Sequence, residues 1–214
     1  MENKQDKQEL LMKKALELYA RSGTLSIRAL AAASGMNVAS VKYYFGNKQN
    51  LIDQIICTLI DSFQQLALDA EKTFEAPRER LRQLLCCACH RMTENPGIAR
   101  LFYNLIGASD GSLAKYSRQA IGPQSPLYRV CRDAIVSETA IADEQELNCR
   151  FLIMISSIAP SFLIGLDPQT GDRFFAQSGQ SAASFPPSIE VYIDALIRTL
   201  LVPGAPQAAG PALC

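Results

Sequence analysis

The amino-acid sequence predicts an all-α protein, and two observations carry this prediction. Apolar residues recur at the helical spacing i, i+3, i+4 in almost every segment, and no segment alternates β-branched with polar residues as a strand does. Breaks containing Gly or Pro separate the helical segments. The expected helices cover about residues 8–22, 27–34, 38–45, 48–72, 78–94, 97–106, 112–121, 127–138, 143–166 and 188–202.

Punctuating residues support these boundaries and divide the chain. Pro77 suits the first turn of a helix, and the acidic pair Asp143 and Glu144 favours the positive end of a helix dipole. Residues 167–187 are rich in Gly, Ser, Gln and Pro and predict a long connection. We expect three parts: a small domain over 1–50, a larger helical domain over 51–202, and a disordered Pro/Ala/Gly tail over 203–214.

Residues 24–51 predict two short helices joined by a Gly turn, with a third helix following at once. Ser26 can cap the first helix, in which Ile27 and Leu30 begin an apolar face. Gly35 can adopt the positive φ that ends this helix, and Asn37 can cap the second. This arrangement is a helix-turn-helix, a motif that places its second helix in the major groove of DNA.

The second helix predicts an outward face suited to DNA. Val41 and Phe45, at i and i+4, are expected to be buried. Small, basic and aromatic residues then face outward: small ones allow close approach, Lys reaches phosphate or guanine, and Tyr offers a hydroxyl beside an apolar ring. The outward residues are Ala39, Ser40, Lys42 and Tyr43, with Asn37 and Val38 at the leading end.

The segment from about residue 8 to residue 55 resembles the N-terminal domain of the TetR family of bacterial transcriptional regulators. An amphipathic helix (LLMKKALELYARSG) precedes Ser-Ile-Arg-x-Leu-Ala, and Gly-Met-Asn-Val-Ala-Ser-Val follows. The most specific part is Tyr43-Tyr44-Phe45, then Gly46-Asn47-Lys48 and Leu51. Asn37 replaces the Ser or Thr cap common in the family, and Asn caps equally well.

The resemblance implies a dimeric regulator, most typically a repressor, that binds a palindromic operator in double-stranded DNA and is released by a small molecule. It also implies that Lys48, at the start of a helix, contacts phosphate and that Arg28 faces DNA. The complete set of expected DNA-binding residues is Ser26, Arg28, Asn37, Val38, Ala39, Ser40, Lys42, Tyr43, Tyr44 and Lys48.

Charge is unevenly distributed along a chain whose net charge is zero. Residues 1–50 hold eight Lys and Arg against four Asp and Glu, whereas residues 51–214 hold thirteen against seventeen. A basic N-terminal domain on an acidic body is typical of a DNA-reading head, and the zero net charge argues against a general polyanion binder.

The sequence also predicts a cytoplasmic protein. The charged start MENKQDKQEL lacks the apolar region of a signal peptide, and no apolar run reaches the roughly 18 residues of a membrane span. Seven Cys without an export signal imply reduced thiols.

The last two helices are apolar on most of their circumference and therefore need burial on two sides. One side suits the core of the domain and the other a second subunit, in agreement with the C-terminal homodimer that the resemblance implies. The alternative is that both helices are central to the core of a monomer.

Cys86, Cys87, Cys89 and His90 form the most distinctive cluster outside the head. Cys86, Cys89 and His90 share a helical face and have ligand types that suit zinc or softer metals, so the alternative function is a metal- or redox-responsive sensor without an organic inducer. Packing is the favoured interpretation, because free Cys behaves as a small hydrophobe and Leu residues flank the cluster. We expect no metal site and no cofactor.

No catalytic motif is present: the chain lacks a Gly-rich phosphate loop, GxSxG and HExxH, and it has one His. An apolar helical body can instead enclose a cavity, and the resemblance implies a small-molecule effector there, for which we expect an apolar molecule. Ordinary core packing is the alternative for each candidate. The candidate lining residues are Phe102, Tyr103, Ile106, Tyr116, Met154 and Phe162.

Overall fold

The computed structural model describes residues 4–108, 111–165 and 188–203, and these residues form helices and connections without a β-strand. The all-α prediction is confirmed. The helices are α1 (Lys4–Ser22), α2 (Ile27–Ser34), α3 (Val38–Phe45), α4 (Lys48–Thr73), α5 (Pro77–Glu94), α6 (Pro96–Ile106), α7 (Gly111–Ile121), α8 (Pro126–Thr139), α9 (Glu144–Gly165) and α11 (Ile189–Leu200).

Helix boundaries follow the local signals closely. α1 begins four residues earlier than expected, with Asp6 in its first turn and the Gln5 amide donating to Glu9 one turn on. α11 is shorter than the expected 188–202, because Ser188 lies outside it as a cap that accepts from the Val191 N–H. The expected connection over 167–187 and tail over 203–214 lie, apart from Pro203, outside the described residues.

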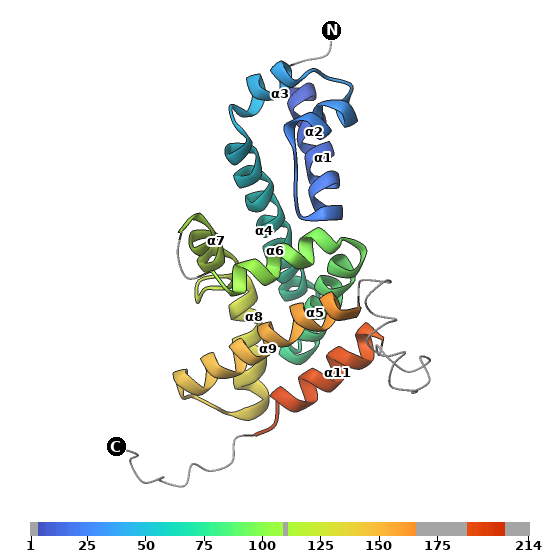
Figure 1. Ribbon diagram of the computed structural model, residues 1–214. Coiled ribbons are helices and arrows are strands. Elements are labelled where there is room, and N and C mark those ends of the chain that lie inside the picture. The colour runs from blue at the N-terminus through green and yellow to red at the C-terminus, as the bar shows by residue number, and fades with distance from the viewer. Residues whose placement is uncertain (1–3, 109–110, 166–187, 204–214) are drawn as a thin grey trace, which may run out of the picture.

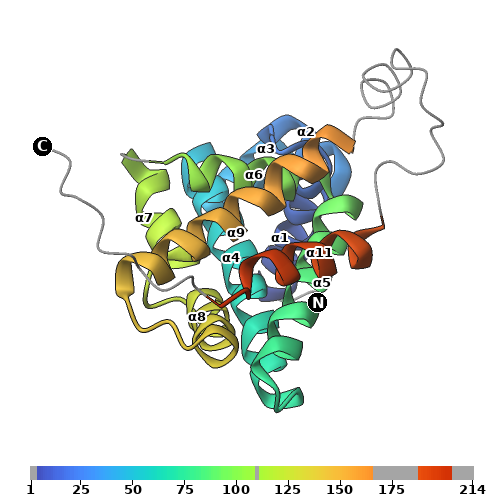
Figure 2. The same ribbon diagram turned by 90° about the horizontal axis from the view of Figure 1, so that it is seen from below.

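A small head and a larger body share the long helix α4 (Figure 1). α1, α2 and α3 pack around the start of α4, which continues into the body and packs there against α5, α7 and α8. α6 reaches back from the body to the end of α1, so a second contact joins body and head. α9 and α11 lie together across the face of the body seen in Figure 2.

The core runs through both parts as one cluster of buried apolar side chains. In the head, Leu11, Leu30, Val41, Leu51 and Ile55 have almost no exposed surface and come from all four helices. Their burial supplies most of the free energy that holds α2 and α3 in place, because isolated helices of eight residues are unstable in water.

Ion pairs join the outer helices of the body to its centre. Arg82 of α5 donates to Asp194 of α11 at 2.7 Å, and Arg129 of α8 forms two bonds to Glu71 of α4 at 2.7 and 2.9 Å. Two parallel hydrogen bonds between one guanidinium and one carboxylate hold the two side chains in a more defined orientation than a single bond does. Within the described residues, no helix is long and apolar enough to cross a membrane.

Candidate nucleic-acid interface and apolar cavity

Side-chain caps build the two short helices of the head. The Ser26 hydroxyl accepts from the Ala29 N–H at 3.0 Å, and the Asn37 amide oxygen accepts from the Ser40 N–H at 2.7 Å. Gly35 lies at φ 67°, where its N–H bonds the last carbonyls of α2. Asn47 caps α4 in the same way, through a bond of 2.8 Å from the Asn50 N–H. Three consecutive caps therefore determine the helix-turn-helix geometry.

α3 divides into a buried and an exposed face as its spacing predicts. Val41 and Phe45 are buried, whereas Lys42 is exposed and the Tyr43 side chain is 69% exposed. Val38 and Ala39 are also exposed, and Ser40 is half-buried. The structure thus leaves a short helical ridge of small, basic and aromatic groups on the outside of the head.

Tyr44 behaves differently from its neighbour. Its side chain is half-buried and packs against the core of the head. The Tyr43 ring meets it edge-on, with ring centroids 5.3 Å apart and an interplanar angle of 79°. An edge-on contact is a favoured aromatic geometry, so Tyr44 supports the exposed Tyr43 ring from behind.

The starts of α2 and α4 lie on one shallow hollow of the head. Lys48 lines this hollow together with Ser26, Thr24 and Ser22. The positive ends of two helix dipoles and an exposed ammonium group favour an anion there. Arg28, the second residue of α2, is exposed. Thr24 is not marked by any motif in the sequence, and its place two residues before the capping Ser26 is the signal that could have indicated it.

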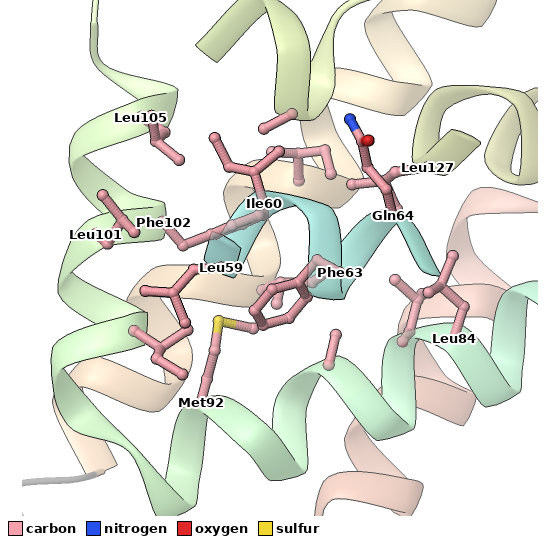
Figure 3. A pocket seen from close by; sticks show the side chains of 16 residues that line it. Leu59, Ile60, Phe63, Gln64, Leu84, Met92, Leu101, Phe102, Leu105 and Leu127 are labelled. Carbon is pink, nitrogen blue, oxygen red and sulfur yellow. The ribbon is translucent and has the colours of Figure 1, made fainter. Parts of the chain in front are cut away.

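An apolar cavity lies in the body, lined by residues of the six helices from α4 to α9 (Figure 3). The centre of a water-sized molecule can occupy about 50 Å³ of the cavity. Fifteen of the sixteen lining side chains are apolar, including Leu59, Phe63, Met92 and Phe102. The cavity is therefore narrow and excludes charge.

Gln64 of α4 is the exception in this lining. Its side-chain amide donates from Nε2 to the backbone carbonyl oxygen of Gln119, at the end of α7, at 2.9 Å. Because a carbonyl oxygen can only accept, this bond determines which end of the amide is nitrogen. The amide oxygen Oε1 has no protein donor among the described residues, and it is open to solvent rather than buried.

The comparisons with known proteins agree with this geometry. Residues 11–55 match the model of the family described as bacterial regulatory proteins, tetR family. The chain is also 30% identical over 137 residues to the HTH-type transcriptional dual regulator CecR of Shigella flexneri. That match covers 59% of this chain and 56% of CecR, so the chain spans about half the length of this curated relative.

Solved structures match nearly the whole chain at low identity. A putative TetR-family regulator from Rhodococcus sp. has a TM-score of 0.65 and 14% identity, with 92% of this chain and 100% of that one covered. FadR of Thermus thermophilus, a TetR-family repressor in complex with lauroyl-CoA, has a TM-score of 0.58 and 15% identity, with 95% and 100% covered. These two matches show that the chain shares the fold of these solved structures.

The head of the chain, residues 11–55, therefore matches the TetR family. The resemblance stated from the head motif is confirmed, and the matched residues 11–55 include all of the helix-turn-helix. The family comprises regulatory proteins, in line with the expectation that the chain is not an enzyme.

Of the five candidate effector residues whose side chains the structure describes, one lies at the cavity. Phe102 lines it, whereas Tyr103 is 55% exposed and Met154 is buried in the core. Ile106 packs against the core outside the lining. The side chain of Phe162 lies outside the described residues.

Tyr116 is buried beside α4 rather than at the cavity. Burial raises the pKa of its hydroxyl to about 12, with the nearby Asp53 and Cys57 adding to the shift. A group so hard to ionise serves packing and local hydrogen bonding between α7 and α4.

The Cys and His cluster is split between core and surface. Cys86 and Cys89 are buried, and burial raises the pKa of both thiols. His90 is exposed and pairs with Glu190 of α11 at 2.9 Å. Among the residues that the structure describes, no three His, Cys, Asp or Glu side chains are placed to hold one metal ion. A raised pKa also lowers the thiolate fraction that metal binding and oxidation require, so the buried Cys86 and Cys89 do not favour the sensor alternative.

Proposed function

We propose that this chain is a DNA-binding transcriptional regulator whose α3 reads an operator in the major groove. The observation that carries the proposal is the exposed ridge of α3, on which Lys42 and Tyr43 project from a helix held by its Asn37 cap and its buried Val41 and Phe45. A three-helix head that served only to pack against the body would have no need for such an exposed face. The regulatory function that the name of CecR states supports the same activity here.

We propose that groups next to α3, on α2 and α4, contact the DNA phosphates. The ammonium group of Lys48 and the N-terminal amides of α2 and α4 supply donors at one hollow, and Arg28 adds an exposed charge. Such contacts position the head on DNA without reading its sequence. Ser26, Asn37, Val38, Ala39, Ser40 and Tyr44 complete the proposed interface.

The active form is proposed to be a homodimer joined through α9 and α11. Leu152 and Ile153 of α9 are 55% and 54% exposed, and Val191 of α11 is 59% exposed, although the opposite faces of both helices are buried. Apolar side chains of this size on adjacent helices favour a partner surface. Two-fold symmetry would place two heads about 34 Å apart, at successive major grooves.

We assign effector binding to the apolar cavity of the body, with residues 1–50 as the DNA-binding part and 51–202 as the part that binds effector and partner. The cavity excludes charge, and the structural neighbour FadR is described in complex with lauroyl-CoA, whose acyl chain is apolar. These features support a repressor that is released from DNA when an apolar small molecule binds. A cytoplasmic location stays a prediction.

Binding selection on randomised double-stranded DNA tests the central proposal. Full-length protein is expected to enrich an inverted repeat whose half-site centres lie about one helical turn, or a multiple of it, apart. Enrichment of no motif, at a salt concentration where non-specific binding is weak, would contradict operator reading.

A further inference from the structure

One hydrogen-bonding side chain faces the apolar cavity of the body, and that side chain is already oriented. In Figure 3, the amide of Gln64 lies at one edge of the cavity, and the other labelled side chains present carbon or, at Met92, sulfur. Gln64 is half-buried, so its amide lies near the mouth rather than in the depth of the core.

The bond from Nε2 of Gln64 to the carbonyl oxygen of Gln119 holds the nitrogen end of the amide against α7. The oxygen end has no protein donor among the described residues and is open to water, so both of its acceptor positions are available to a ligand. A ligand that covers this oxygen with carbon removes it from water, which is unfavourable, whereas a ligand that donates to it restores the lost hydrogen bond.

We propose that the cavity binds a neutral, mostly apolar molecule that carries one hydroxyl or N–H group and donates it to Oε1 of Gln64. This inference rests on the proposed function, because it specifies the effector of the same cavity. The fifteen apolar side chains of the lining favour an apolar ligand, and the single amide favours a hydrogen-bond donor on that ligand.

The lining also decides against an ionised polar group. No Lys, Arg or His side chain lines the cavity, so a carboxylate there would lose its hydration without gaining a countercharge. The narrow space favours a thin or flat ligand, which enters as flexible side chains such as Met92 move.

Competition with a fluorescent dye tests the proposal on the full-length protein. N-phenyl-1-naphthylamine, a neutral apolar dye, is bound first, and it is then displaced by 1-nonanol, by the isomeric octyl methyl ether, or by nonanoate. The alcohol and the ether have the same atoms, but only the alcohol donates a hydrogen bond. Gln64→Met keeps the length of the side chain and removes its amide.

The expected result is an alcohol-to-ether preference about fivefold greater in the unsubstituted protein than in Gln64→Met, as the typical net strength of one hydrogen bond implies. Nonanoate should displace the dye least well. Gln65→Met is the matched control, because Gln65 is exposed, bonds Asp69 at 2.7 Å and does not line the cavity. It should keep the preference unchanged.

An equal preference in the unsubstituted protein and Gln64→Met would overturn the role of Gln64, and stronger binding of nonanoate than of nonanol would overturn the neutral class. If Gln64→Met does not fold, Gln64→Leu takes its place. Absence of saturable dye binding would overturn the effector cavity itself and this inference with it, whereas DNA selection would still test operator reading separately.

Discussion

Gly97 of α6 lies directly against the carbonyl oxygen of Tyr19 in α1, with no room for a Cβ atom between them. The N–H of Gly23 and the carbonyl oxygen of Ala20 close the same space. Nearby, Arg100 donates to the carbonyl oxygen of Ser22 at 3.2 Å. The end of α1 in the head thus contacts the start of α6, and α6 also lines the cavity through Leu101 and Phe102.

Gly97→Ala is expected to destabilise the protein by about 1–3 kcal/mol, because the added methyl group meets backbone atoms that cannot move aside independently. Elsewhere in a helix the same change stabilises by about 0.5–1 kcal/mol. Gly107→Ala is the control: the nearest atom to its added Cβ, the Tyr103 carbonyl oxygen, lies 3.9 Å away. Thermal or urea unfolding measures both. Equal stability of the two variants would contradict the close contact.

Lys48→Ala is expected to weaken binding to all DNA sequences alike and to lower the salt slope by roughly one unit, because one phosphate contact is lost. Lys72→Ala, near the far end of the same helix and exposed, should leave both quantities unchanged. Titration of labelled DNA at several salt concentrations provides the slope. If Lys48→Ala retains the original slope and affinity, Lys48 makes no phosphate contact.

Lys42→Ala is expected to cost about 1–3 kcal/mol on the selected operator and to relax the preference at one base pair in each half-site. The reason is that Lys can donate to O6 and N7 of guanine, so a G is expected opposite Lys42. Binding selection with both proteins reveals the change. Identical motifs, with uniformly weaker binding, would assign Lys42 to phosphate instead.

Sedimentation of the full chain is expected to give a dimer of about 47 kDa, twice the 23.4 kDa of the chain. Ile153→Glu should shift this equilibrium toward monomer, because it places a charge on the proposed contact face of α9. Leu10→Glu alters a residue of α1 that is 43% exposed and should leave the dimer intact. A monomer at micromolar concentration in the unsubstituted protein would contradict the dimer.

The sequence by itself determined the head. The bounds of α2 and α3 agree with expectation residue for residue, because caps at Ser26 and Asn37 and the positive φ of Gly35 are local signals that act within one turn. The two faces of α3 follow for the same reason: a residue's direction on a short helix depends only on its spacing from Val41 and Phe45.

Tertiary structure alone decided which side chains meet in the body. The sequence indicates that Tyr103, Tyr116 and Met154 lie on apolar helices, but the packing of several helices decides whether each faces solvent, a neighbouring helix or the core. The cavity and the place of Gln64 within it arise where the six helices from α4 to α9 converge. Packing brings together residues that are far apart in the chain, and no local sequence pattern predicts that contact.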